Sequence, residues 1–98
     1  MIYRNKRLTE SAKHEECVSC GNPQCCWCHS NSYIHGKGRS QKAHDLFGFY
    51  GCQLCHDWFD GKSNIIPPSF EGFIDKEEWF ASMWQRSMIV ACEKGYIK

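Results

Sequence analysis

Apolar residues occur along this chain in short clusters separated by polar segments, and only the last cluster has a clear helical period. Two clusters, residues 24–30 and 46–52, are short and rich in aromatic side chains or cysteine, a pattern that favours β-strands. A weak, mostly polar helix is expected before them, over residues 3–15. Strands followed by helices predict an α+β fold.

Two helices are predicted after the strands. The segment "QLCHDWFDGK" indicates a short helix that ends at Gly61. A longer helix is expected over about 75–94, because Asp75 and Glu78 can cap its start and Gly95 can end it. Its expected core-facing side chains, at helical spacing, are Phe80, Met83, Trp84, Met88 and Ala91.

The length of 98 residues predicts a single domain over 1–98, with its centre at about 17–61. A core of this size is only marginally stable alone, so a bound metal or disulfides would add substantially to the stability of the fold. The start of the chain is polar and lacks the apolar stretch of a secretory signal, and no window approaches a membrane span. We therefore expect a protein of the cytoplasm, where thiols stay reduced and eight cysteines favour metal binding.

Three Cys-x-x-Cys pairs start at Cys17, Cys25 and Cys52. Two pairs can give zinc its four thiolates. We expect the ligands to be the pairs Cys17/Cys20 and Cys52/Cys55, because this choice closes a long loop around the strands. The alternative second pair, Cys25/Cys28, would require a turn where a strand is predicted, since positions 25 and 28 of a strand point to opposite faces. A redox pair is disfavoured because no βαβ pattern surrounds it.

Two further cysteines, Cys26 and Cys92, belong to no pair. If the favoured set binds zinc, then Cys26, Cys28 and Cys92 are expected to be small buried residues. Cys25, on the strand face of His29, remains a further candidate metal contact.

Two histidines are candidates for catalysis. His29 lies on the same strand face as Trp27, near the strand end, and His56 directly follows Cys55. If the strands and the short helix pack around zinc, both imidazoles could face one cleft, where one binds a cation and the other takes a proton from water. The alternative reading is that each is a capping or surface residue.

The net charge of +1 neither favours nor excludes nucleic acid as a ligand. Lys37, Arg39 and Lys42 concentrate positive charge in one polar segment, "HGKGRSQK". Such a segment can contact phosphates, although solvated surface charge explains it equally well.

The segments "EECVSCGNP", "CHSNSYIHGKG" and "KAHDLFGFYGCQLCHDWFDGK", with the terminal "EKGYIK", resemble the YbcO-type family of small phage and prophage nucleases. This family belongs to the HNH, or His-Me finger, group of ββα-metal nucleases. The resemblance covers residues 15–97, and the phage recombination nuclease Rap (NinG) is more distantly similar. It implies a zinc-stabilised ββα-metal domain with an additional C-terminal helix.

The resemblance also implies roles for individual residues. The structural zinc would be held by Cys17, Cys20, Cys52 and Cys55. His29 would be the general base, and His56 would bind a catalytic Mg²⁺ or Mn²⁺. The basic residues Lys37, Arg39 and Lys42 would contact the DNA backbone.

Two departures from the family pattern affect the predicted centre. Cys28 stands where many HNH enzymes have a metal-binding Asp or His, and the asparagine that orients the base has no match on the second strand. Asp45 is the nearest candidate for that orienting role, Asn31 is a second, and Asp57 could help His56 to hold the cation.

Two hypotheses follow. The first is a metal-dependent endonuclease that hydrolyses DNA in phage recombination, replication or host takeover, inside the bacterial host cell. The second is a catalytically silent zinc module of the same fold that binds DNA or a protein partner, such as a host enzyme that it inhibits, or a second copy of the chain.

Overall fold

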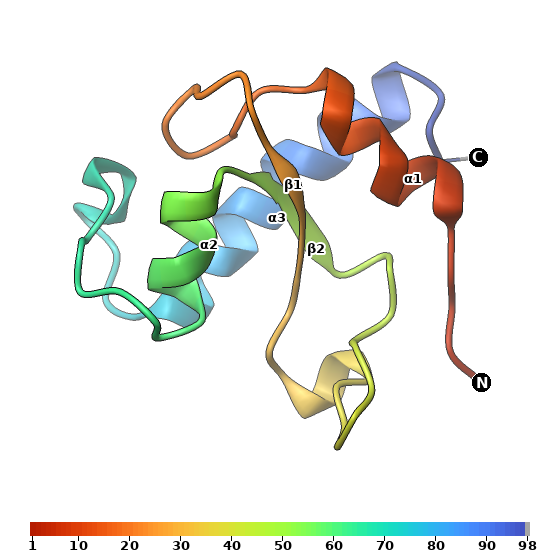
Figure 1. Ribbon diagram of the computed structural model, residues 1–98, viewed down its shortest axis with the longest axis horizontal. Helices are drawn as coiled ribbons and strands as arrows, with labels where there is room; N and C mark the ends of the chain where they lie inside the picture. The colour runs from red at the N-terminus through yellow and green to blue at the C-terminus, as the bar shows by residue number, and fades with distance from the viewer. Residues whose placement is uncertain (98) are drawn as a thin grey trace.

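The structure, a computed structural model, describes residues 1–97 and contains two strands and three α-helices in that range (Figure 1). The α-helices and strands are α1 (Lys6–Ser11), β1 (Cys26–His29), β2 (Gly48–Gly51), α2 (Gln53–Phe59) and α3 (Lys76–Glu93). Short 3-10 helices are η1 (Ala12–His14), η2 (Tyr33–His35) and η3 (Pro68–Phe70). The predicted α+β class is confirmed in this coarse sense.

The two strands form one antiparallel sheet in which Trp27 pairs with Tyr50 and His29 with Gly48. Its ladder continues past the strand ends, since the Ser30 amide donates to the Phe47 carbonyl at 2.8 Å. A side chain at position 48 would not fit, because a Cβ atom there would lie 2.8 Å from the Cys28 carbonyl oxygen. Glycine thus permits the close approach of the strands at this end of the hairpin.

The hairpin has one face toward α2 and α3. Cys28 and Phe49 point into this main core, where Phe49 meets the Trp79 ring edge-on at 5.2 Å between centroids. The remaining buried members of this core are Trp58, Phe59, Phe80 and Met83. Burial of these large rings supplies most of the hydrophobic stabilisation that so short a chain can obtain.

The other face of the hairpin is covered by the N-terminal part of the chain. Trp27 and Tyr50 pack there against Leu8 and Ala12, and Ala91 of α3 completes the cluster. Figure 1 shows α1 and α2 on opposite sides of the hairpin, with α3 running behind it. The sheet is therefore enclosed on both faces.

The helix ends follow from local sequence. Asn5 caps α1 by accepting a hydrogen bond from the Leu8 amide, so the expected helix over 3–15 begins only at Lys6 and ends in the 3-10 turn η1. Asp75 caps α3 through the Glu78 amide at 2.9 Å, as predicted, and Gly95 follows the helix with φ of +76°.

The buried face of α3 differs in part from the expected one. Trp79, Phe80, Met83, Ser87 and Ala91 are buried, whereas Trp84 and Met88 are only partly so. Ser87 is buried because its hydroxyl accepts the Tyr50 amide hydrogen at 3.0 Å, which ties α3 to β2.

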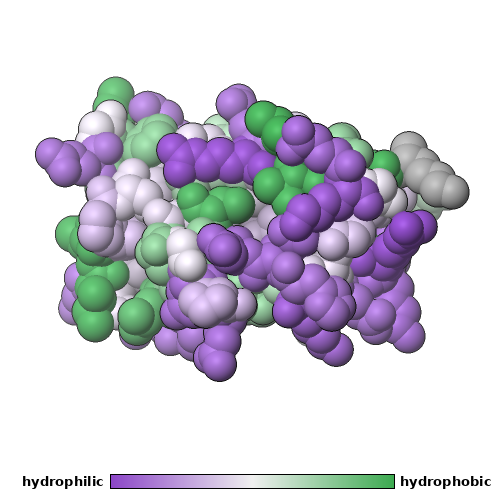
Figure 2. Space-filling view, turned by 90° about the horizontal axis from the view of Figure 1, so that it is seen from above, coloured by the Kyte–Doolittle hydropathy of each residue, from purple (hydrophilic) through white to green (hydrophobic). Residues whose placement is uncertain are grey.

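The surface seen in Figure 2 is mainly hydrophilic, with hydrophobic residues in small separate groups. Within residues 1–97, no helix has the length and apolar character needed to cross a bilayer.

Candidate metal centre

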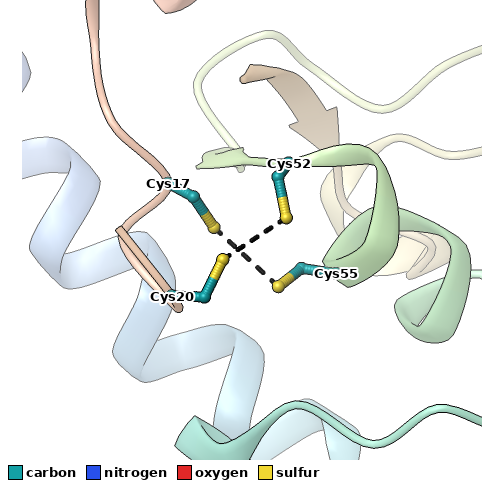
Figure 3. Close-up of side chains that lie close together, drawn as sticks. All are labelled: Cys17, Cys20, Cys52 and Cys55. Atoms are coloured by element: carbon teal, nitrogen blue, oxygen red, sulfur yellow. Dashed lines mark hydrogen bonds between the residues drawn. The ribbon is translucent and has the colours of Figure 1, made fainter. Parts of the chain in front are cut away.

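Four cysteines from two distant segments meet at one point. Cys17 and Cys20 come from the turn before β1, and Cys52 and Cys55 from the start of α2, with their sulfur atoms directed toward one another (Figure 3). The Sγ atoms of Cys17 and Cys55 are 3.8 Å apart, and those of Cys20 and Cys52 are 3.5 Å apart. This is the ligand set expected from the sequence.

The spacing of these sulfur atoms fits a tetrahedral zinc ion. Zinc–sulfur bonds of about 2.3 Å in a tetrahedron separate the sulfurs by about 3.8 Å. All four ligand atoms lie within 4.8 Å of one another. Three of the four residues are buried, with only Cys20 exposed, so the site is closed in the manner of a structural centre.

The turn chemistry of the sequence positions the first pair. The Gly21 amide donates to the Cys17 carbonyl at 2.8 Å, and Gly21 has φ of +80°, a conformation that glycine adopts without strain. The second pair is positioned by α2, because Cys52 is its N-cap residue and Cys55 lies in its first turn.

The close contact between the thiols gives them different pKa values. The contact between the Cys17 and Cys55 thiols lowers the pKa of Cys17 to about 4 and raises that of Cys55. A thiolate is thus already favoured within the group, and a bound cation would favour the deprotonated form of all four.

Cys25 lies outside this ligand group. Its thiol donates to the carbonyl oxygens of Ala12 at 3.0 Å and Glu15 at 3.1 Å. Burial, aided by the nearby sulfur of Cys17, raises the pKa of Cys25 to about 12. This residue is therefore a hydrogen-bonded thiol that ties the segment before β1 to the strand.

His56 lies beside a second cysteine group rather than beside the first. Its Nδ1 is 3.9 Å from Cys26 Sγ, which is 3.7 Å from Cys28 Sγ. These three ligand atoms lie within 4.8 Å of one another. The expectation that Cys26, Cys28 and Cys92 are buried hydrophobic residues holds only for Cys28, since Cys26 is half-buried and Cys92 is exposed.

Asp60 is the carboxylate that contacts His56. His56 Nε2 lies 2.9 Å from Asp60 Oδ2, and the Asn31 side-chain amide donates to Asp60 Oδ1 at 2.9 Å. Asp57, the expected helper of His56, instead accepts a hydrogen bond from Gln53 at 2.7 Å. On a helix the neighbours of a residue are three and four positions away, so the adjacent position 57 points elsewhere.

The pKa of His56 is raised, first by its contact with Cys26 and then by the charge of Asp60. The pKa of Cys26 is lowered to about 5 by the donated S–H of Cys28 and by the imidazole, whereas that of Cys28 is raised. A cation that replaces the proton shared by Cys26 and His56 would be bound by the thiolate and the neutral imidazole.

His29 lies against a different carboxylate. Its Nε2 is 2.8 Å from Asp45 Oδ1, with the carboxylate buried. Asp45 Oδ2 accepts the Asn5 amide at 2.7 Å, and Arg4 approaches Oδ1 at 3.2 Å. Asp45 therefore joins β1 to the N-terminal segment, and it is the carboxylate that contacts His29.

The two candidate imidazoles contact different carboxylates, Asp45 for His29 and Asp60 for His56. His29 projects from the face of β1 that carries Trp27, whose indole donates to the Asp45 carbonyl at 2.9 Å. His56 contacts Cys26, which points to the opposite face. The Asn31 side chain, two residues beyond His29, donates to Asp60, so the end of β1 lies near the carboxylate of His56.

The predicted DNA contacts Lys37, Arg39 and Lys42 are exposed in the segment between η2 and β2, called here the basic loop (residues 37–42). A cavity of about 620 Å³ lies near the start of that segment, between Tyr33, Phe47 and Trp84. Neither His29 nor His56 lines this cavity. The loop therefore presents charge to solvent and is held by Arg4, which donates to the Lys42 carbonyl at 3.0 Å.

Sequence analysis did not identify Asp60 as the partner of His56, nor Cys26 as a candidate metal ligand beside it. The signal for Asp60 was present, because it lies four residues after His56 on a predicted helix. The signal for Cys26 and Cys28 was their shared strand face, which brings two thiols to the same side.

No family model, curated protein or solved structure matches this chain.

Proposed function

We propose that this chain is a metal-dependent phosphodiester hydrolase of the ββα-metal, or HNH, type that acts on DNA. The observation that carries the proposal is that both candidate histidines have Nε2 against a carboxylate, His29 on Asp45 and His56 on Asp60. Such a partner fixes the ring and its tautomer, which both a general base and a metal-binding imidazole require.

His29 is proposed as the general base. The Asp45 carboxylate accepts a hydrogen bond from Nε2–H, which leaves the lone pair on Nδ1. Removal of a proton from water makes the ring an imidazolium, which the adjacent carboxylate stabilises. Asp45 would thereby take over the orienting role of the asparagine that this chain lacks.

His56 is proposed to hold the catalytic cation, with Asp60 behind it. The cation supplies charge stabilisation of the scissile phosphate and of the leaving oxygen. Mg²⁺ or Mn²⁺ was expected from the family resemblance, but both prefer oxygen ligands, and two thiols flank Nδ1 of His56. Asp60 and Asn31 are the oxygen-bearing side chains that meet at this position.

The basic loop is proposed to bind the DNA backbone, since its exposed cations can neutralise phosphates without sequence preference. Within this proposal the biological setting is that of a phage-encoded enzyme in the bacterial cytoplasm, acting in recombination, replication or host takeover.

A second candidate function is a catalytically silent zinc module that binds DNA, a protein partner or a second copy of the chain. It is favoured by two departures from the HNH pattern, Cys28 in place of a metal-binding Asp or His and the missing asparagine of the second strand. The four-cysteine group would stabilise the fold regardless of catalysis.

Nicking of supercoiled plasmid in the presence of Mg²⁺, Mn²⁺ or Zn²⁺ tests the proposal. We expect cutting by the wild type, with His29→Ala and His56→Ala each reducing it at least about 100-fold, the usual scale for a lost acid–base group. His14→Ala is the matched control, because His14 is exposed. Circular dichroism shows that each variant is folded.

Absence of cutting by the folded wild type, or equal cutting by all variants, would favour the silent module. Cutting that requires His56 but not His29 would retain the cation site and reject His29 as the base.

A further inference from the structure

We propose that Cys26, Cys28 and His56 form a second metal site, for zinc or a similarly soft divalent ion, distinct from the four-cysteine group. Its ligand atoms converge without contribution from Cys17, Cys20, Cys52 or Cys55. The site includes the same His56 as the proposed function. It rests on that function only for the catalytic role of the ion, because the protein can bind the ion without hydrolysing DNA.

The geometry of the site follows from the two elements that supply it. Cys26 and Cys28 are two positions apart on β1, so both thiols point to the same face, with 3.7 Å between the sulfurs. The fourth residue of α2, His56, brings Nδ1 to 3.9 Å from Cys26 Sγ. These spacings match ligands that surround one tetrahedral ion, as in the first site.

The imidazole is oriented for this ligand role by groups behind it. Asp60 lies at the opposite ring nitrogen, Nε2, and is itself held by the Asn31 amide. A metal-binding histidine commonly gives its other N–H to a carboxylate, which fixes the ring and raises its basicity. Asn31 therefore positions Asp60, and Asp60 positions His56, with Nδ1 facing the thiols.

The donor set determines the class of ion. Two thiolates and an imidazole are soft or borderline ligands that favour zinc over Mg²⁺ or Ca²⁺. Two thiolates also balance the charge of one divalent ion, so a neutral centre can lie next to the core around Cys28. The four-thiolate site would retain two negative charges, and the two sites therefore differ in net charge.

Three protein ligands leave one tetrahedral position open, which is the arrangement of catalytic rather than structural zinc. Cys28 is fully buried, but Cys26 is partly exposed. Cys26 also lines a hollow of about 460 Å³ beside Asn22, Gln24 and Gln53. The exposed side of the site is thus accessible to water or to a small anionic ligand.

Metal content of the purified, folded protein tests this inference. We expect about two zinc ions per chain in the wild type and about one in Cys26→Ser, since serine is a poor zinc ligand. His56→Gln is the second variant and should also hold about one. Cys92→Ser is the matched control, because Cys92 is an exposed cysteine outside both groups, and it should retain about two.

Cobalt substitution gives an independent readout. Sulfur-to-cobalt absorption in the near ultraviolet should fall in Cys26→Ser relative to Cys92→Ser, while circular dichroism of the two variants remains the same. A wild type with about one zinc, unchanged in Cys26→Ser, would overturn the second site.

The outcome is separable from that of the nicking assay. About two zinc ions without nicking would support this site and reject hydrolysis. Nicking with Mg²⁺ by a protein that holds about one zinc would support hydrolysis and overturn the second site.

Discussion

The imidazole of His29 and the buried carboxylate of Asp45 lie 2.8 Å apart and join the end of β1 to the segment before β2. The same carboxylate also accepts the backbone amide of Asn5 and the guanidinium of Arg4. One side chain thus connects three parts of the chain that are distant in sequence. Whatever His29 does chemically, this contact also contributes to the stability of the fold.

Asp45→Asn should lower the free energy of unfolding by about 1.5–3 kcal/mol, since a hydrogen bond to a charged, buried group contributes about that much. The amide that replaces the carboxylate has one acceptor oxygen for three donors. Urea unfolding of the zinc-loaded protein measures the change. The matched control is Asp57→Asn, whose carboxylate accepts only an exposed Gln53 contact among the described residues, and its effect should stay within about 0.5 kcal/mol.

Loss of one cysteine from the four-cysteine group should unfold the protein. Cys17→Ser or Cys52→Ser takes one thiolate from a closed four-cysteine site that supplies much of the folding free energy of a small domain. Loss of bound zinc together with loss of the far-ultraviolet dichroism of α3 is the expected result. Cys92→Ser is again the control and should remain folded. A folded, zinc-free Cys17→Ser protein would show that the hydrophobic core is sufficient alone.

A methyl group at position 48 should loosen the hairpin. The Cβ of Gly48→Ala would lie 2.5 Å from Trp27 Nε1 and 2.8 Å from the Cys28 carbonyl oxygen, so the strands must move apart. Overpacking of this kind costs about 1–3 kcal/mol, measurable by urea unfolding. At Gly38→Ala the nearest atom is 3.9 Å away, and that control should be close to neutral. Equal stability of both variants would contradict the register.

Alkylation should distinguish Cys25 from Cys92 in the zinc-loaded protein. Only the thiolate reacts, and burial raises the pKa of Cys25 to about 12, so at pH 8 this thiol stays protonated. Its reaction with iodoacetamide should be slow and should rise about tenfold per pH unit toward that value. Exposed Cys92 should react first. Peptide mass spectrometry after timed labelling measures both, and rapid labelling of Cys25 at pH 8 would contradict its hydrogen bonds to Ala12 and Glu15.

Sequence alone predicted the two strands, the helix after them and the long C-terminal helix, because each has its own local signal. Alternation correctly assigned Trp27 and Cys28 to opposite strand faces. The choice of Cys17, Cys20, Cys52 and Cys55 as the group that could hold zinc rested on strand geometry, since a strand cannot direct positions 25 and 28 to one ion. These features depend on residues close in sequence, where spacing determines geometry.

The tertiary contacts were not predictable in the same way. Trp79 is fully buried, although it lies at the edge of the expected apolar face, because it fills the space between Phe49 and Trp58. The contacts of His29 also depend on distant parts of the chain. Its partner Asp45 lies sixteen residues away and is held by the N-terminal segment, and no local pattern indicates that segment's path.

Neutralisation of the basic loop should weaken DNA binding if the proposed function holds. The triple substitution of Lys37, Arg39 and Lys42 to Gln removes exposed charges only, so the fold should be unaffected. For duplex DNA, each lost phosphate contact lowers the slope of log affinity against log salt by about 0.9. The slope, measured by fluorescence anisotropy between low and moderate salt, should therefore fall by about 2–3.

A control with the same charge change replaces three exposed lysines elsewhere, Lys6, Lys13 and Lys62. Equal slopes for the two triple variants would show that the loop is solvated surface, and that any DNA contact lies on another part of the molecule.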